Sequence, residues 1–88
     1  MRFSVLVETR LRDGVADPQG STIERSLPVV GFGGISGVRV GKAFRFEVEA
    51  PDRATAEAQV AEVCQRVLIN PVIEEASATL AEVAEVPA

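Results

Sequence analysis

A single cysteine, Cys64, is the one residue of this sequence with the chemistry of a strong nucleophile. A reactive cysteine needs a lowered pKa, which a neighbouring histidine or the start of a helix commonly provides. The sequence has no histidine, and Cys64 falls late in an expected helix, on its apolar side. We therefore predict a buried thiol. A lone cysteine also excludes an internal disulfide and a multi-cysteine metal site.

Two pairs of glutamates are candidates for an acid/base pair or a magnesium site. Adjacent residues of a strand point to opposite faces, so Glu74 and Glu75 are expected to diverge. Glu47 and Glu49 share a face, but carboxylates on a strand surface are usually solvated. Histidine, the most frequent general base and metal ligand, is missing. The sequence thus predicts no catalytic, cofactor or metal site in this chain.

The glycine-rich stretch Gly31-Phe32-Gly33-Gly34 has the composition of a phosphate-binding loop. Such loops run from a strand into the N-terminus of a helix, whose dipole holds the anion. This stretch instead runs from a helix into an expected strand, so it does not fit a phosphate. Gly31 is better explained as the residue that caps the C-terminus of the first helix.

Arg39 and Lys42 form the only compact basic spot in a chain of net charge −4. Nucleic-acid binding is not expected, because phosphate neutralisation needs a basic face. The spot has two interpretations, a solubilising hairpin and a docking point for an acidic patch on a partner. Exposed turns often carry function, so both remain open.

Length and composition indicate one globular domain. The chain has 88 residues, of which 47% are hydrophobic and 25% charged, as in ordinary globular proteins. It has no apolar run of the roughly 18 residues that a membrane helix requires, and its N-terminus does not resemble a signal peptide. The default expectation is a cytoplasmic protein that does not bind membranes.

Six elements are expected in order along the chain. Alternating apolar residues predict strands over residues 2–11 and 43–50, the latter with a buried face of Phe44, Phe46 and Val48. Asp17-Pro18 begins a helix that Pro28 ends. Further elements are a strand at 35–42 with a tight turn at Gly41-Lys42, a helix from Asp52 to Asn70-Pro71, a strand at 72–80, and a flexible tail at 81–88.

The order strand, helix, strand, strand, helix, strand is typical of the α+β ferredoxin-like fold. Right-handed crossovers then place both helices on one face of a four-stranded antiparallel sheet. The domain spans residues 1–80. The other face of the sheet is left open and partly apolar, which favours self-association.

Three short motifs, in this order and spacing, resemble the PurS family, the small subunit of phosphoribosylformylglycinamidine synthase. They are Asp17-Pro18-Gln19-Gly20, then Val38-Arg39-Val40-Gly41-Lys42 after Gly31-Phe32, and finally Asn70-Pro71-Val72-Ile73-Glu74 after Cys64. The resemblance spans about residues 1–80. Pro28 departs from the family pattern, because relatives usually continue the first helix there, and the tail after residue 80 has no clear family role.

The resemblance implies a ferredoxin-like subunit that forms a homodimer or larger homo-oligomer. It would bridge a glutaminase (PurQ) and a synthetase (PurL) and help ammonia pass between them. The complex would convert FGAR to FGAM with glutamine and ATP, in purine biosynthesis. ATP and Mg²⁺ would bind to the synthetase and not to this chain.

Five residues are predicted to lie at or near partner contacts: Asp17, Gln19, Arg39, Lys42 and Asn70. Each can also be purely structural. Two alternatives to the subunit role remain. Ferredoxin-like domains often bind small molecules at a dimer interface, so a ligand-sensing regulatory domain is the second candidate, and fold alone does not decide. An independent enzyme is the third, and the missing catalytic groups argue against it.

Overall fold

Alternation of apolar and polar residues in the first strand sets the layout of the molecule. In the computed structural model, which describes residues 1–84, β1 (Arg2–Leu11) is the central strand of an antiparallel sheet in the order β2-β1-β3. β2 spans Ala43–Glu49 and β3 spans Glu74–Val83. Phe3, Val5 and Val7 of β1 are fully buried, as the two-residue period of the sequence predicts.

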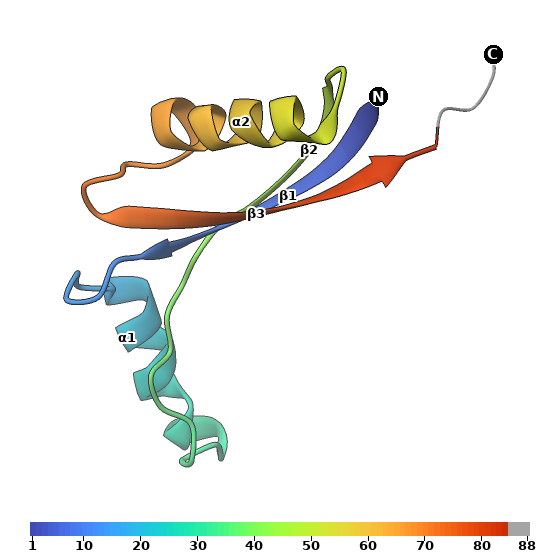
Figure 1. Ribbon diagram of the computed structural model, residues 1–88. Coiled ribbons are helices and arrows are strands. Elements are labelled where there is room, and N and C mark those ends of the chain that lie inside the picture. The colour runs from blue at the N-terminus through green and yellow to red at the C-terminus, as the bar shows by residue number, and fades with distance from the viewer. Residues whose placement is uncertain (85–88) are drawn as a thin grey trace.

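One helix covers this buried face. α2 (Arg53–Val63) begins at Asp52, whose carboxylate accepts the Thr55 amide at 2.7 Å. A π-helical turn, η2 (Cys64–Leu68), continues it. Figure 1 shows α2 lying along one side of the sheet, where Ala56, Val60 and Cys64 are buried against β1 and β3. These three residues are spaced by four, so they lie on one face of the helix, and that apolar face packs on the sheet.

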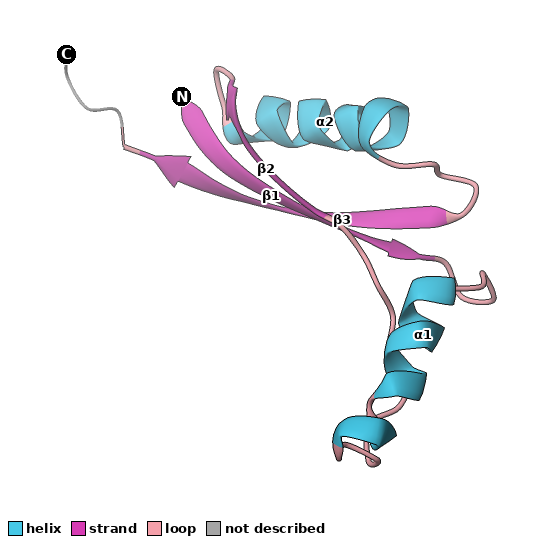
Figure 2. Cartoon of the chain, turned by 180° about the vertical axis from the view of Figure 1, so that it is seen from behind, coloured by secondary structure: helices cyan, strands magenta, loops and turns pink. Residues whose placement is uncertain are grey.

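The first helix departs from the predicted arrangement. α1 (Pro18–Ser26) and the 3₁₀ helix η1 (Pro28–Val30) extend away from the sheet, on the side opposite α2 (Figures 1 and 2). Pro28 ends α1 as expected, and Gly31 caps η1 with φ 98°. The prediction of two helices on one face is therefore wrong for the single chain, which is α+β with one helix on the sheet.

The fourth strand is also absent within residues 1–84. Residues 35–42 were expected to be a strand, but residues 35–41 run beside α1 and pair with no strand. Only Lys42 bonds to the sheet, through Thr9 of β1, so the predicted tight hairpin at Gly41-Lys42 does not form. Two carboxylates hold this segment instead, because Asp17 accepts the Val40 amide at 2.7 Å and Glu24 accepts the Val38 amide at 2.8 Å. The Val38 and Val40 amides thus find acceptors without a strand partner.

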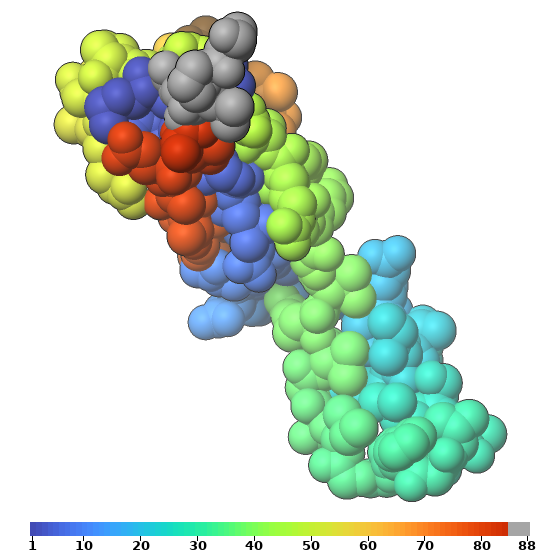
Figure 3. Space-filling model, turned by 90° about the vertical axis from the view of Figure 1, so that its right-hand side faces the viewer, coloured from blue at the N-terminus to red at the C-terminus, as the bar shows by residue number. Residues whose placement is uncertain are grey.

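We call residues 12–41 the arm. A compact chain of this length has a radius of gyration of about 12 Å, whereas the value here is 17.4 Å, with extents of 53 × 30 × 16 Å. The arm accounts for the excess, and Figure 3 shows it as a separate lobe. Apolar side chains of the arm remain exposed: Ile23 is 45% accessible, Val30 66% and Phe32 57%.

The last strand is longer than expected. β3 ends at Val83, so residues 81–83 belong to the sheet and not to the predicted tail. Their pairing with Arg2, Phe3 and Ser4 explains the extension, because the start of β1 would otherwise lack a neighbour on this side. The remainder of the predicted tail, residues 85–88, lies outside the described residues.

Candidate functional site

The root of the arm forms a groove of about 410 Å³, and three of the five predicted contact residues line it. Asp17 and Gln19 come from the start of α1, and Lys42 precedes β2. Thr9 and Glu74 complete the wall from β1 and β3. Segments that are distant in sequence thus meet where the arm leaves the sheet.

Asp17 holds the groove together. Its side chain is 8% accessible, with one carboxylate oxygen accepting the Gly20 amide at 2.9 Å and the other accepting the Val40 amide at 2.7 Å. The Gly20 hydrogen bond, then that from Val40, lowers the pKa of Asp17 below its usual value, and the positive charge of Arg39 adds to this. The predicted helix cap is confirmed, and the same carboxylate fixes the returning segment of the arm.

Protonation of Asp17 is therefore expected to loosen the arm. Because its folded pKa is lowered, its contribution to stability is complete above the ordinary pKa and is lost as the pH falls through the lower folded value. Asp17→Asn should reduce the Tm at pH 7, and should flatten the loss of stability as the pH falls below the ordinary pKa of an aspartate. Thermal unfolding at a series of pH values measures both. Asp13→Asn, in the exposed preceding turn, is the matched control, and an unchanged pH profile in Asp17→Asn would contradict the assignment.

Arg39 has a structural role at the same place. Its guanidinium donates to the carbonyl oxygens of Val15 at 3.2 Å and Arg12 at 3.4 Å. These bonds tie the returning segment of the arm to the turn that precedes α1. The Lys42 main chain pairs with Thr9, whose amide donates to the Lys42 carbonyl at 2.9 Å and whose hydroxyl accepts the Lys42 amide at 3.1 Å. Lys42 is also one of the residues that line the groove.

Asn70 lies next to the groove and not in its wall. Its amide donates to the Glu74 carboxylate at 2.9 Å, and its carbonyl accepts the Glu74 amide at 2.8 Å. These two main-chain bonds of Asn70 hold the turn before β3, and Glu74 at the end of this turn lines the groove. Partner contact by Asp17, Gln19, Arg39, Lys42 and Asn70 stays a prediction, because the chain is described alone.

Two residues of the groove wall, Thr9 and Glu74, are not among the five predicted partner contacts. Thr9 occupies an apolar-face position of β1 and is 5% accessible. A hydroxyl among core residues needs a hydrogen-bond partner. That requirement is the feature of the sequence that could have indicated a contact of Thr9 with another segment. Glu74 was considered only as half of an acid/base pair with Glu75, and its carboxylate instead accepts the Asn70 amide.

Gly41 is required by the close contact of the arm with β1. A Cβ at this position would collide with the carbonyl oxygen of Thr9. Gly41→Ala must shift the backbone, which costs about 1–3 kcal/mol and, since a domain of this size loses about 4–8 °C per kcal/mol, should lower the Tm by at least about 4 °C. Gly33→Ala is the matched control, because its Cβ would meet open space. Equal Tm values for the two variants would contradict this role of Gly41.

Catalytic alternatives fit the geometry poorly. Cys64 is buried, and this burial raises the pKa of its thiol, which disfavours the nucleophilic thiolate. Glu47 and Glu49 lie 3.6 and 3.5 Å from the Arg2 guanidinium, and Glu75 lies 3.0 Å from that of Arg10. These carboxylates form exposed ion pairs along the open sheet face. Within the described residues, no helix is long and apolar enough to cross a membrane.

Comparisons with known proteins agree with this arrangement. The family model described as "PurS: Phosphoribosylformylglycinamidine (FGAM) synthase" matches residues 4–82. The phosphoribosylformylglycinamidine synthase subunit PurS of Archaeoglobus fulgidus is 41% identical over 71 residues, which cover 81% of this chain and 89% of that protein. The corresponding subunit of Bacillus subtilis is 34% identical over 73 residues, covering 83% and 86%.

Solved structures give the same result. A chain in the structure of PurLQS from Thermotoga maritima matches with a TM-score of 0.85 and 33% identity, covering 92% of this chain and 99% of that chain. The structure of PurS from B. subtilis matches with a TM-score of 0.81 and 32% identity, covering 91% and 99%. The protein belongs to the PurS family of phosphoribosylformylglycinamidine (FGAM) synthase.

Proposed function

We propose that this chain is a non-catalytic subunit of the FGAM synthase complex in purine biosynthesis. Family membership over residues 4–82 carries the proposal, and the match to a chain of the Thermotoga PurLQS structure supports a role within an assembly. In this proposal the chain bridges a PurL-type synthetase and a PurQ-type glutaminase and assists ammonia transfer. ATP and Mg²⁺ bind to the synthetase, and the complex works in the cytoplasm.

The groove at the root of the arm is the proposed contact with a larger subunit. Lys42 and Gln19 line this groove and bring a cation and an amide hydrogen-bond donor to it. Together they suit an acidic segment of the partner, because charge-assisted hydrogen bonds are stronger than neutral ones. Arg39 supports this contact by holding the arm in place.

We also propose a homodimer in which two chains exchange arms. β2 is an edge strand, and beside it Phe46, Val48 and Val63 line a shallow apolar hollow of about 290 Å³. Residues 35–42 of a second copy can add to β2 as a fourth strand, and its α1 can cover the hollow. The four-stranded ferredoxin-like sheet expected from the sequence is then completed by two chains. Such an exchange is a low-cost route to a dimer.

Reconstitution tests the subunit role. The chain is mixed with PurL-type and PurQ-type subunits, and FGAM formation is measured with glutamine or with free ammonia. Glutamine-driven turnover should require the chain, whereas turnover with free ammonia should largely bypass it, because only the former needs ammonia to pass between subunits.

Two outcomes would count against the proposal. If neither rate responds and no complex forms, the bridging role is wrong for this chain, and the ligand-sensing alternative takes precedence. Calorimetry with a panel of amino acids and nucleotides would then identify a ligand. Equal dependence of both rates on the chain would instead indicate a direct effect on the synthetase.

A further inference from the structure

The outer edge of β3 presents main-chain groups whose direction follows from the pairing of β1. Met1 and Ala50 exchange two hydrogen bonds, of 2.8 and 2.9 Å, and the Thr9 amide donates to the Lys42 carbonyl at 2.9 Å. Odd-numbered residues of β1 therefore point their main-chain groups toward β2, and even-numbered ones point toward β3, because directions alternate along a strand.

The register then assigns the two sides of β3. Leu6 and Glu8 lie opposite Thr79 and Ser77, so odd-numbered residues of β3 bond to β1 and even-numbered ones point outward. Two contacts support this independently. Arg53 donates to the Leu80 carbonyl at 2.7 Å, and the Glu74 amide donates to the Asn70 carbonyl at 2.8 Å. Both ends of the edge are thus occupied within the chain.

The middle of the edge is open. Within residues 1–84, no hydrogen bond is recorded for the outward main-chain groups of Ala76 and Ala78. The stretch from 76 to 81 carries no charge and no proline, which are the features that usually protect an edge strand. β2, the other edge strand, is the one that the exchanged arm of a second copy would cover. The edge of β3 can therefore accept another strand.

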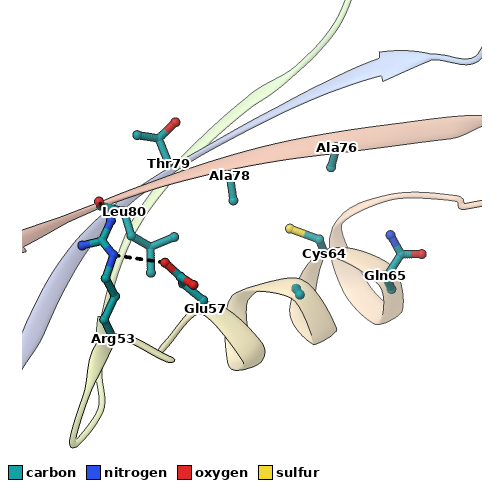
Figure 4. A pocket seen from close by; sticks show the side chains of 9 residues that line it. Arg53, Glu57, Cys64, Gln65, Ala76, Ala78, Thr79 and Leu80 are labelled. Carbon is teal, nitrogen blue, oxygen red and sulfur yellow. Dashed lines mark hydrogen bonds and ion pairs between the residues drawn. The ribbon is translucent and has the colours of Figure 1, made fainter. Parts of the chain in front are cut away.

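A groove of about 480 Å³ lies between this edge and α2 (Figure 4). Ala76 and Ala78 from β3 and Ala61 from α2 make its middle, with Cys64 beside them. The rest of the lining is Arg53, Glu57, Gln65, Thr79 and Leu80. Ala78 points toward α2 and is still exposed, since nothing larger fills the space. An added strand would place every second side chain in this groove.

We propose that the outer edge of β3, from Ala76 to Leu80, binds an extended segment of a partner protein by strand addition. The segment carries apolar side chains at alternate positions, which enter the groove, and a basic residue near Glu82, which lies on the α2 face at one end of the edge. A second copy of this chain fits less well, because it would bring its own glutamates and a net charge of −4. This edge is separate from the groove at the root of the arm and from β2.

Amide exchange measured by NMR tests the proposal on the full chain. The probe is a synthetic nonapeptide of alternating valine and threonine with a lysine at each end, added to millimolar concentration. Exchange of the outward Ala76 and Ala78 amides should slow by about tenfold or more, because bonded amides exchange only on opening. The Ser77 and Thr79 amides, which already bond to β1, should change little. A peptide N-methylated at alternate residues, unable to pair, is the control.

Two variants separate strand addition from general binding. Ala78→Pro removes an outward amide and leaves the ladder to β1 intact, which an edge strand tolerates. It should weaken peptide binding by about tenfold, a difference near 1.4 kcal/mol, whereas Ala78→Ser should bind as the parent does. Ala76→Lys, which places a charge at the groove, should also weaken peptide binding. This variant replaces Ala78→Pro in the test if the proline variant does not fold.

Three results would overturn the proposal. The first is no slowing at Ala76 and Ala78 with the unmethylated peptide. The second is equal binding of the N-methylated peptide. The third is slow exchange of both amides in the peptide-free chain that is lost on dilution, since a second copy would then occupy the edge. None of these results bears on the glutamine-driven activity, so the subunit role is tested separately.

Discussion

Phe32→Asp is expected to convert the protein into a monomer. Phe32 is 57% accessible at the tip of the arm, between exposed Val30 and Ile35. If the arms exchange, each dimer buries two copies of this ring, at about 2 kcal/mol each. Losing both weakens the dimer by about 4 kcal/mol, roughly a thousandfold in the dissociation constant, before the cost of burying a carboxylate.

Sedimentation equilibrium over a range of concentrations measures this change. Val72→Asp is the matched control, because Val72 is 80% accessible in the turn before β3 and lies outside the arm. It introduces the same charge and should leave the dimer intact. A parent protein that is monomeric throughout, or a dimer that survives Phe32→Asp, would refute the arm exchange.

Phe3→Ala is expected to unfold much of the domain. Phe3 is 1% accessible between the sheet and α2, and the Arg53 guanidinium lies 6.0 Å from its ring centroid. Removing a buried phenylalanine costs about 3–5 kcal/mol, out of a total that is roughly 4–13 kcal/mol for a chain of this length. The Tm should fall by at least about 12 °C.

Urea and thermal unfolding, followed by circular dichroism, provide the measurement. Val72→Ala is the control, because truncating an exposed valine should change stability by no more than about 0.5 kcal/mol. The protein concentration must be the same in all samples, since association adds to apparent stability. A Phe3→Ala loss below about 1 kcal/mol would mean that this core contributes far less than its burial indicates.

Local signals in the sequence were reliable guides to the elements. The alternation of Phe3, Val5 and Val7 predicted the buried face of β1. Asp17 and Asp52 predicted the starts of both helices. Pro28 predicted the end of α1. Each of these signals depends on steric or hydrogen-bonding preferences within a few residues. The tertiary contacts are compatible with those preferences, so the predicted boundaries are kept.

The predicted groove residues were partly brought together. Asp17, Gln19 and Lys42 meet in one place, although they come from different segments. Their convergence, and the part played by Thr9, depend on where the arm returns to the sheet. No pattern in residues 35–42 distinguishes a segment that pairs with a strand from one held by the carboxylates of Asp17 and Glu24.

The sequence by itself determined the order of the helices and of the strands that form, the buried faces of β1 and β2, the boundaries set by proline and aspartate, and the family. It did not determine the buried face of β3, where Leu80, expected on the open side of the sheet, lies in the core. Only the tertiary structure decided that α1 and residues 35–42 leave the sheet and that β3 has an open edge beside a groove. The physical reason is that apolar periodicity indicates which residues will be buried. It does not indicate which surface will cover them. The stripe of Ile23 and Val30 is satisfied equally by the chain's own sheet or by another chain's, and a local pattern is the same in both cases.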